Sequence, residues 1–358
     1  MTTIEDLIAR IGPLDAAAME AARARHRQLT KPPGSLGRLE ELAITLAGIV
    51  GRPIPAVERK AVVVMAGDHG VALAGVSAYP QAVTAQMVAN FLAGGAAINV
   101  LARRAGARVV VVDVGVAAEL PALPGLVARK VRPGTRSMVE GPAMTRDEAL
   151  EAVQVGADVL EAEAARGLDL VGTGDMGIGN TTASSAILAA MAGCPVVEVT
   201  GRGTGVDDAG FARKVAAIER ALEVNQPDPS DPVDVLAKVG GLEIAGLVGV
   251  ILGAASRRIP VLVDGFISGA AALVATELCP AARAYLIAAH SSVEVGHRLM
   301  LERMELAPLL RLDLRLGEGT GAAMAMQLVD DAVAVLAEMA TFVEAGVSDR
   351  EAAEESAR

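Results

Sequence analysis

Short apolar runs rich in valine and isoleucine alternate with alanine-rich stretches, and this alternation constrains the fold more than any other feature of the chain. The apolar runs are Ala61–Met65, Val109–Val112, Leu168–Val171, Val196–Val199, Ile259–Val263 and Tyr285–Ala288. Continuous runs of this kind, separated by helices, are typical of parallel strands that are buried on both faces of a sheet. We therefore predict an α/β fold: a Rossmann-like, mostly parallel six-stranded sheet with helices on both faces.

The stretches between and around these runs have the apolar spacing of helices. Between the runs they are Thr84–Ala105, Thr145–Ala165, Thr181–Ala192, Asp208–Leu222, Leu242–Ala255 and Gly269–Glu277. Towards the ends of the chain they are Ile4–Arg27, Leu39–Val50, Val293–Leu310 and Ala322–Val343.

Each apolar run ends in glycine, acidic or hydroxyl residues, and ligands of open parallel sheets bind beyond the carboxyl ends of the strands. The longest such turn, Gly172–Thr182, reads Gly-Thr-Gly-Asp-Met-Gly-Ile-Gly-Asn-Thr-Thr. Glycines let a ligand approach the backbone closely, and free N–H groups at the start of the following helix suit a phosphate. The spacing is neither that of the usual dinucleotide fingerprint nor that of a Walker P-loop. A tight strand-to-helix connection without a ligand is the alternative interpretation.

Composition argues against several classes of partner. The net charge of −11 argues against a nucleic-acid surface, and an aromatic content of 2% argues against base-stacking platforms. The longest apolar run, Ile244–Ala255, is shorter than the roughly 20 residues that a membrane span needs. We therefore expect neither nucleic acid nor a membrane as a partner.

The cysteines and the first residues favour a cytoplasmic location. Cys194 and Cys279 lie in apolar surroundings without metal-ligand spacing, which fits a reducing compartment. Met1–Arg10 carries acidic residues and does not resemble a secretory leader. His290 and His297 are seven positions apart, wider than the spacing of common helical metal sites, so we expect no metal.

Glu318 is the carboxylate best suited to proton transfer. It lies between Gly317 and Gly319, with an apolar helix after it. A partly desolvated carboxylate in such a turn has a raised pKa and can accept a proton near neutral pH. The alternative is an exposed acid that stabilises the dipole of the following helix.

Other polar residues of the predicted turns have two interpretations each. Asp175 and Asn180 can hold ribose hydroxyls or cap the next helix, and Thr181 can bind a phosphate or be a plain cap residue. Arg202 and Lys214 can neutralise a phosphate. Lys214 falls on a predicted helix, where a solvated surface charge is the alternative.

Asp264 follows a predicted strand and can bind ribose hydroxyls. Asp68-His69 and His290 resemble parts of acid–base pairs, although a hydrogen-bonded histidine without a catalytic role is the simpler interpretation of each.

Seven segments together resemble the ordered motifs of one family, the nicotinate-nucleotide:dimethylbenzimidazole phosphoribosyltransferases. The segments are Lys31–Glu40, Gly67–Val71, Gly172–Thr182, Gly201–Gly205, Asp264–Ala270, His290–His297 and Leu314–Ala323. The resemblance runs from about Lys31 to the last predicted helix. Lys-Pro-Pro-Gly-Ser-Leu-Gly, Gly-Asp-Met-Gly-Ile-Gly-Asn-Thr-Thr and Arg-Leu-Gly-Glu-Gly-Thr-Gly, in this order, are its most specific motifs.

The resemblance implies a fold and a reaction. The family fold combines a Rossmann-like sheet with a small helical domain and assembles as a homodimer. Residues 30–298 are then the catalytic domain, and residues 1–29 and 299–358 the helical domain beside the active site. The implied reaction transfers the phosphoribosyl group of nicotinate mononucleotide to 5,6-dimethylbenzimidazole, for the lower ligand of cobalamin, with Glu318 as the general base and no cofactor or metal.

The resemblance also implies which residues bind the substrates. The donor phosphate is expected against the Gly174–Thr181 and Gly201–Gly203 turns. The residues implied on the donor side are Gly174, Asp175, Gly177, Gly179, Asn180, Thr181, Gly201, Arg202, Gly203, Lys214, Asp264, Ser291 and Ser292. Those implied for the acceptor pocket are Ser77, Tyr79, Gln86, Met176 and Leu316. The family often carries a longer acid at the position of Asp175, and core packing is the alternative role for Tyr79 and Met176.

Two other functions compete with this interpretation. A nicotinamide-cofactor dehydrogenase predicts an early Gly-x-Gly-x-x-Gly turn, whereas the first such turn here is Gly67-Asp68-His69-Gly70. A non-catalytic nucleotide-binding module would keep its ligand affinity when Glu318 is replaced by glutamine.

Overall fold

A computed structural model of the chain describes residues 3–348, which divide into two compact units. The first comprises the described residues up to Gly12 together with Arg59–Ala325, and the second comprises Pro13–Glu58 and the described residues from Met326 onward. The division into residues 30–298 and two flanking segments stays a prediction.

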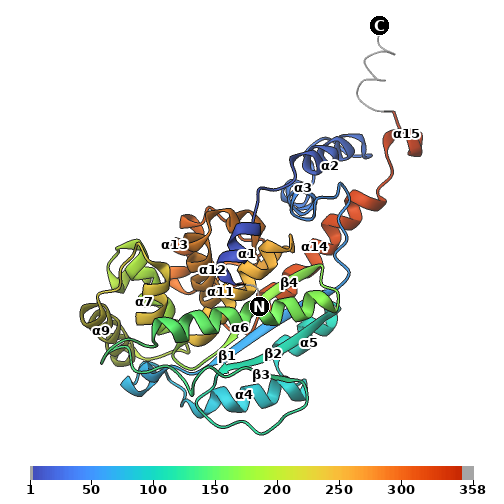
Figure 1. Cartoon of the computed structure of the whole chain (residues 1–358). Coiled ribbons are helices and arrows are strands. Elements are labelled where there is room, and N and C mark those ends of the chain that lie inside the picture. The colour runs from blue at the N-terminus through green and yellow to red at the C-terminus, as the bar shows by residue number, and fades with distance from the viewer. Residues whose placement is uncertain (1–2, 349–358) are drawn as a thin grey trace. The chain divides into compact units, whose positions relative to one another are not determined.

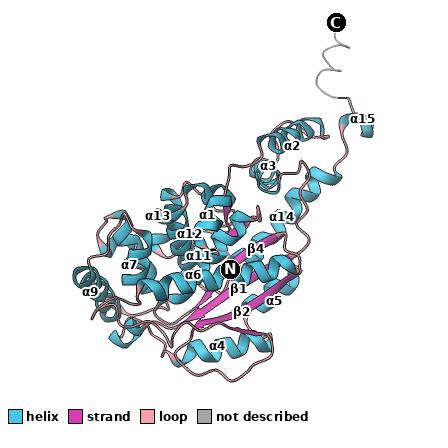
Figure 2. Cartoon of the chain, in the orientation of Figure 1, coloured by secondary structure: helices cyan, strands magenta, loops and turns pink. Residues whose placement is uncertain are grey.

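The first unit is built on a six-stranded sheet in which each pair of neighbouring strands is parallel (Figures 1 and 2). Its strands are β1 (Lys60–Gly67), β2 (Ala107–Gly115), β3 (Leu126–Ala128), β4 (Leu170–Met176), β5 (Val261–Val263) and β6 (Leu286–Ala288). Their order across the sheet is β3-β2-β1-β4-β5-β6. Helices cover both faces, so the predicted α/β class is confirmed.

In the described part of the chain, twelve α-helices lie wholly or partly in the first unit, and the last of them, α14, continues into the second unit. They are α1 (Ile4–Arg10), α4 (Ala82–Ala93), α5 (Ala97–Arg104), α6 (Arg146–Ala165), α7 (Asn180–Ala192), α8 (Val196–Val199), α9 (Asp208–Asn225), α10 (Pro232–Val239), α11 (Leu242–Ser256), α12 (Phe266–Leu278), α13 (Val295–Arg303) and α14 (Thr320–Glu338). The short 3₁₀ helices η1 (Gly70–Ala74) and η2 (Pro280–Tyr285) lie between them in sequence. The second unit contains the end of α14 together with α2 (Ala16–Gln28), α3 (Arg38–Val50) and α15 (Phe342–Ala345).

One predicted strand is wrong, because Val196–Val199 forms α8. Val196 and Val199 are buried, whereas Val197 is 55% exposed, which is the three-residue spacing of a helical turn. Pro195, with φ of −58°, sets the backbone for a helix start. The strand that takes its place in the count of six is β3, which was not predicted. It is a three-residue edge strand, too short to give a periodic signal in the sequence.

The strand order places a ligand crevice between β1 and β4. The chain adds β2 and β3 on one side of β1, then returns to add β4, β5 and β6 on the other. Such a reversal opens a crevice beyond the carboxyl ends of the two central strands. Met65 of β1 pairs there with Asp175 of β4, so Asp175 lies at the crevice edge.

Close helix packing on one face holds the central strands. The buried helix α11 packs against β1, β4 and α6. A Cβ atom added to Gly156 of α6 would lie 1.8 Å from the Gly246 carbonyl oxygen, and one added to Gly249 of α11 would lie 1.8 Å from that of Val153. The two backbones therefore touch, which only glycine allows.

Two stretches, Ala82–Arg104 and Thr320–Glu338, have the length and composition of a membrane-spanning helix. Core helices of soluble proteins pass the same test, and 33% and 50% of the two apolar windows are buried. The first stretch is also interrupted, because Gly94, with φ of 78°, ends α4 before α5 begins.

Candidate active site

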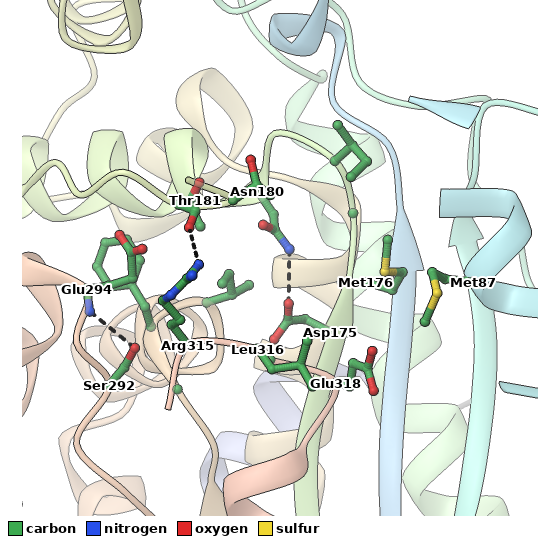
Figure 3. Close-up of a pocket in the computed structure, with 18 of the residues that line it drawn as sticks. Met87, Asp175, Met176, Asn180, Thr181, Ser292, Glu294, Arg315, Leu316 and Glu318 are labelled. Carbon is green, nitrogen blue, oxygen red and sulfur yellow. Dashed lines mark hydrogen bonds between the residues drawn. The ribbon is translucent and has the colours of Figure 1, made fainter. Parts of the chain in front are cut away.

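A pocket lies beyond the carboxyl ends of β4, β5 and β6 and is closed on one side by the turn before α14 (Figure 3). Its lining residues are Tyr79, Val83, Met87, Asp175, Met176, Gly177, Ile178, Asn180, Thr181, Gly203, Thr204, Gly265, Phe266, Ile267, His290, Ser292, Glu294, Arg315, Leu316, Gly317 and Glu318. The polar residues at the strand ends therefore meet at one site, as the parallel sheet requires.

Glu318 occupies an unusual backbone conformation in this pocket. Its φ is 61°, and those of Gly317 and Gly319 are 79° and 88°, so three consecutive residues are left-handed. This region is uncommon for a residue with a side chain, and such conformations cluster at functional sites. Gly174 of β4 allows the turn to approach, since a Cβ atom there would lie 2.5 Å from the Glu318 carbonyl oxygen.

The surroundings of Glu318 favour a proton-accepting carboxylate. The residue is 5% exposed, and its Oε2 accepts a hydrogen bond of 3.3 Å from the backbone N–H of Ile98 at the start of α5. Burial raises the pKa of Glu318, and the Ile98 hydrogen bond only partly opposes this effect. The side chain can then hold a proton more readily than an exposed glutamate.

Asp175 lies between Glu318 and Asn180 in Figure 3. Its Oδ2 accepts a hydrogen bond of 3.0 Å from the Asn180 side chain. Burial raises the pKa of Asp175 well above its usual range, and the negative charges of Asp264, Glu243 and Glu318 add to this effect. The raised pKa favours the protonated form of Asp175 more than in an exposed aspartate, which reduces the negative charge beside Glu318.

The Asp264 carboxylate fixes the turn that contains Glu318 through hydrogen bonds to the backbone. Its two carboxylate oxygens accept hydrogen bonds from the backbone N–H groups of Gly319, at 3.1 Å, and Ala322, at 2.9 Å. The residue is fully buried, and burial raises its pKa to about 7. Asp264 is not among the lining residues, and its carboxylate contacts the backbone of Gly319 and of Ala322 in the first turn of α14.

Lys214 joins the two glycine turns. Its Nζ donates hydrogen bonds to Thr181 Oγ1 at 2.8 Å and to the Gly201 carbonyl oxygen at 3.1 Å. The residue is fully buried on α9, and burial lowers its pKa to about 8, partly offset by the charge of Glu294. A buried cation at two glycine turns suits a phosphate, and a solvated surface charge is excluded for Lys214.

About half of the predicted site residues line the pocket. Those that line it are Tyr79, Asp175, Met176, Gly177, Asn180, Thr181, Gly203, Ser292, Leu316 and Glu318. Those outside the lining set are Ser77, Gln86, Gly174, Gly179, Gly201, Arg202, Lys214, Asp264 and Ser291.

Some residues of the second group lie next to the lining residues. Ser77 Oγ lies 3.3 Å from Thr204 Oγ1, and Gly179 is the N-cap of α7. Arg202 lines a neighbouring cavity and forms an ion pair of 2.5 Å with Asp208. Gln86 is exposed on α4.

Several lining residues were not predicted, namely Val83, Met87, Ile178, Thr204, Gly265, Phe266, Ile267, His290, Glu294, Arg315 and Gly317. Glu294 and Arg315 fall inside two of the segments that carry the family resemblance, so charge within those segments was an available signal. Met87 lines the pocket in place of its neighbour Gln86, because the sequence did not show which of these two residues of α4 faces the pocket.

Two buried histidines near the site each contact a protein group through one ring nitrogen. His69 Nε2 lies 2.7 Å from Glu243 Oε1, and His297 Nδ1 accepts a hydrogen bond of 2.9 Å from the Ser292 N–H. Burial lowers the pKa of His297 to about 3, so its ring is neutral. Within residues 3–348, no group of three or more His, Cys, Asp or Glu side chains is arranged to hold a metal ion.

Comparison with known proteins extends over nearly the whole chain. A family model described as phosphoribosyltransferase matches residues 11–347. A nicotinate-nucleotide–dimethylbenzimidazole phosphoribosyltransferase of Chloroflexus aggregans is 61% identical over 353 residues, which cover 99% of this chain and 100% of the relative. The protein of the same name from a Roseiflexus species is 60% identical over 350 residues, which cover 98% and 99%.

Solved structures agree with the fold. The crystal structure of CobT from Thermus thermophilus matches with a TM-score of 0.90 and 51% identity, covering 93% of this chain and 99% of that one. A second structure, of the nicotinate-nucleotide–dimethylbenzimidazole phosphoribosyltransferase from the same organism, matches with a TM-score of 0.89 and 50% identity, covering 94% and 100%.

Proposed function

Because the chain belongs to the nicotinate-nucleotide–dimethylbenzimidazole phosphoribosyltransferase family, we propose that it transfers the phosphoribosyl group of nicotinate mononucleotide to 5,6-dimethylbenzimidazole. The products are α-ribazole 5′-phosphate and nicotinate. The enzyme is a pentosyltransferase of cobalamin lower-ligand synthesis. The observation that carries the detailed proposal is the buried, left-handed Glu318 in the pocket at the sheet edge.

Bond breaking in this reaction needs little help from an acid. The pyridinium ring leaves with the electron pair of the C1′–N bond and becomes neutral, so it needs no proton and no cation. Its departure leaves oxocarbenium-like positive charge on the ribose. A benzimidazole nitrogen then attacks C1′ from the opposite face, which inverts the configuration from β to α.

Bond making is where Glu318 acts. The acceptor's other ring nitrogen carries a proton that must be lost once the new bond forms, and the Glu318 carboxylate accepts it. The raised pKa of Glu318, caused by burial, makes the carboxylate a stronger base than an exposed glutamate. A positioned base of this kind contributes about 10²–10⁴-fold, and alignment of the two rings contributes up to about 7–11 kcal/mol more.

The two substrates occupy different sides of the pocket in this proposal. The donor phosphate lies against the Gly174–Thr181 and Gly201–Gly203 turns, where Lys214 supplies positive charge. The acceptor ring lies among apolar side chains that include Tyr79, Met176 and Leu316. Asp264 acts on the Glu318 turn through the backbone of α14.

Three further features belong to the proposal: a homodimer, a cytoplasmic location, and a helical domain made of residues 1–29 and 299–358 beside a catalytic domain of residues 30–298. Light scattering of the purified protein tests the dimer, and limited proteolysis tests the domain boundaries.

The activity is tested by incubating the purified protein with nicotinate mononucleotide and dimethylbenzimidazole in the presence of a chelator. We expect free nicotinate and α-ribazole 5′-phosphate to appear in equal amounts. Nicotinate release without the ribazole product would indicate a hydrolase, and no release of either would contradict the proposed reaction.

A further inference from the structure

We propose that Glu294 binds the ribose hydroxyls of the phosphoribosyl donor and so determines which sugars the site accepts. The inference rests on the proposed function, since it takes a ribose-containing donor as the substrate. Glu294 lines the pocket together with Thr181 and Ser292 (Figure 3). No part of the reaction described above uses it.

The side chain of Glu294 is held in the pocket wall with one oxygen not engaged by the described part of the protein. Glu294 is the N-cap residue of α13, yet its carboxylate makes no hydrogen bond to that helix. The residue is 8% exposed, and within residues 3–348 its buried Oε2 has no hydrogen-bond partner. A buried carboxylate oxygen normally accepts hydrogen bonds, so an unpartnered one on a residue that lines the pocket is suited to a ligand that donates.

The position of the carboxylate places such a ligand near the proposed phosphate site. A Cβ atom added to Gly201 would lie 1.9 Å from Glu294 Oε2, so the carboxylate rests against the Gly201 backbone. The carbonyl of the same Gly201 accepts the hydrogen bond from Lys214. A ribose joined to a phosphate at this turn would therefore have its ring close to Glu294.

The view of the site supports a separate place for the acceptor. In Figure 3, Glu294 and Ser292 lie across the pocket from Met87 and Glu318. Glu318 can then accept a proton from the acceptor ring on one side while Glu294 contacts the donor sugar on the other.

The chemistry of the substrates narrows what Glu294 can bind. The donor's phosphate has no hydrogen to donate and pairs with Lys214 in this proposal, a carboxylate repels the nicotinate carboxylate, and the pyridinium ring has no N–H group. The hydrogen-bond donors that the two substrates offer are the ribose 2′- and 3′-hydroxyls and the N–H of the benzimidazole. Since Glu318 is assigned to that N–H, the ribose hydroxyls fit Glu294, as acids commonly bind ribose in nucleotide sites.

One other acid competes for this role. Asp264 has both oxygens engaged by backbone N–H groups. Asp175 also lines the pocket, and its buried Oδ1 lacks a hydrogen-bond partner in the described part of the chain. An experiment must therefore compare Glu294 with Asp175.

The test measures kcat/KM for nicotinate mononucleotide and for its 2′-deoxy and 3′-deoxy analogues, with dimethylbenzimidazole as the acceptor. It compares the full-length wild-type protein with Glu294→Gln, Asp175→Asn and the control Glu302→Gln, an exposed acid of α13 paired with Arg298. Each analogue is compared between enzymes, so its intrinsic reactivity cancels. We expect Glu294→Gln to lower kcat/KM about 10- to 100-fold for the natural donor, and less than about 3-fold for the analogue that lacks the contacted hydroxyl.

A second variant keeps the proposal testable if Glu294→Gln fails to fold. Gly201→Ala would displace the Glu294 carboxylate while preserving its charge, and we expect the same loss of sugar discrimination. Equal losses for all donors, no loss for any, or a loss of discrimination in Asp175→Asn alone would overturn the proposal.

Failure of the proposed reaction is recognised separately, because the wild-type protein would then not turn over the natural donor. In that case calorimetry compares the binding of ribose 5-phosphate and 2-deoxyribose 5-phosphate. A preference of the wild type for the ribose compound that Glu294→Gln abolishes would support the assignment, and equal binding of the two compounds by the wild type would overturn it.

Discussion

The backbone N–H of Ile98 donates a hydrogen bond of 3.3 Å to Oε2 of Glu318, so the first turn of α5 orients a carboxylate that lies 220 residues further along the chain. The partial positive charge of a helix start stabilises the ionised carboxylate, whereas burial destabilises it. Burial is the larger effect, and the pKa of Glu318 is raised. The site thus holds a carboxylate that is both oriented and more basic than an exposed glutamate.

Replacing Glu318 with glutamine should remove the base and preserve the shape of the pocket. We expect kcat to fall by about 10²–10⁴-fold with little change in KM for either substrate, because the amide cannot accept the proton. Steady-state kinetics measure the effect, and Glu223→Gln, on the exposed face of α9, is the matched control. Turnover within a few-fold of the wild type would remove Glu318 from the role of base.

The pH dependence of kcat should show a group whose pKa lies above that of an ordinary glutamate. Because the pKa of Glu318 is raised, protonation abolishes its basicity at a higher pH than usual, and kcat falls as the pH decreases through that value. Asp264, with a pKa of about 7, titrates nearby. The pH profile of Asp264→Asn shows which of the two groups causes the fall of kcat at low pH. If Glu318 causes it, the fall should persist in this variant.

Deprotonation of Lys214 should cause kcat/KM for the donor to fall on the alkaline side of the pH profile. Its pKa is lowered to about 8 by burial, so the free enzyme loses this positive charge as the pH rises through about 8. We expect kcat/KM for nicotinate mononucleotide to decrease over that range. Lys214→Met should lower kcat/KM by about 10- to 100-fold and remove this decrease, while Lys238→Met, a lysine of α10 paired with Asp234, should do neither.

The His69–Glu243 pair should make stability depend on pH. Burial alone lowers the pKa of His69, but the Glu243 carboxylate outweighs it and the net pKa is raised. The folded protein therefore keeps a proton that the unfolded chain releases above about pH 6.5. The stabilising contribution is complete below that pH and is lost as the pH rises through the folded-state pKa.

Glu243→Gln should remove this pH dependence and destabilise the protein at about pH 6 by about 3–5 kcal/mol, because it leaves a buried imidazolium without its counter-charge. Urea unfolding of the variant and the wild type at several pH values measures both effects. A variant with the same pH dependence as the wild type would contradict the assignment of the proton to His69.

The contact between α6 and α11 should not tolerate a side chain. Gly249→Ala would place a Cβ atom 1.8 Å from the Val153 carbonyl oxygen, so we expect the free energy of unfolding to fall by at least about 2 kcal/mol. Gly141→Ala is the control, since no heavy atom lies within 4 Å of its added Cβ atom. Equal stability of the two variants in thermal unfolding would show that the helices can separate at little cost.

The class of fold, the turn around Glu318 and the family could all be predicted from the amino-acid sequence. Runs of valine and isoleucine between helices require a parallel sheet buried on both faces, whatever the details of packing. A glutamate between two glycines allows a left-handed turn, and the φ of 61° at Glu318 agrees with that local signal. The family was identified from several specific motifs that occur in a fixed order along the chain, a combination that unrelated sequences do not share.

Which residues meet, and what each one faces, depended on packing in three dimensions. Val196–Val199 has the composition of a strand, but burial of its first and last residues makes it a helical turn. Lys214 has the sequence context of a surface charge, yet it is fully buried on α9 and contacts Thr181. Asp264 and Glu294 are both acids after strands. The backbone N–H groups of Gly319 and Ala322 donate to the first, whereas Oε2 of the second has no hydrogen-bond partner among the described residues. These differences arise from contacts between residues far apart in sequence, which local patterns do not encode.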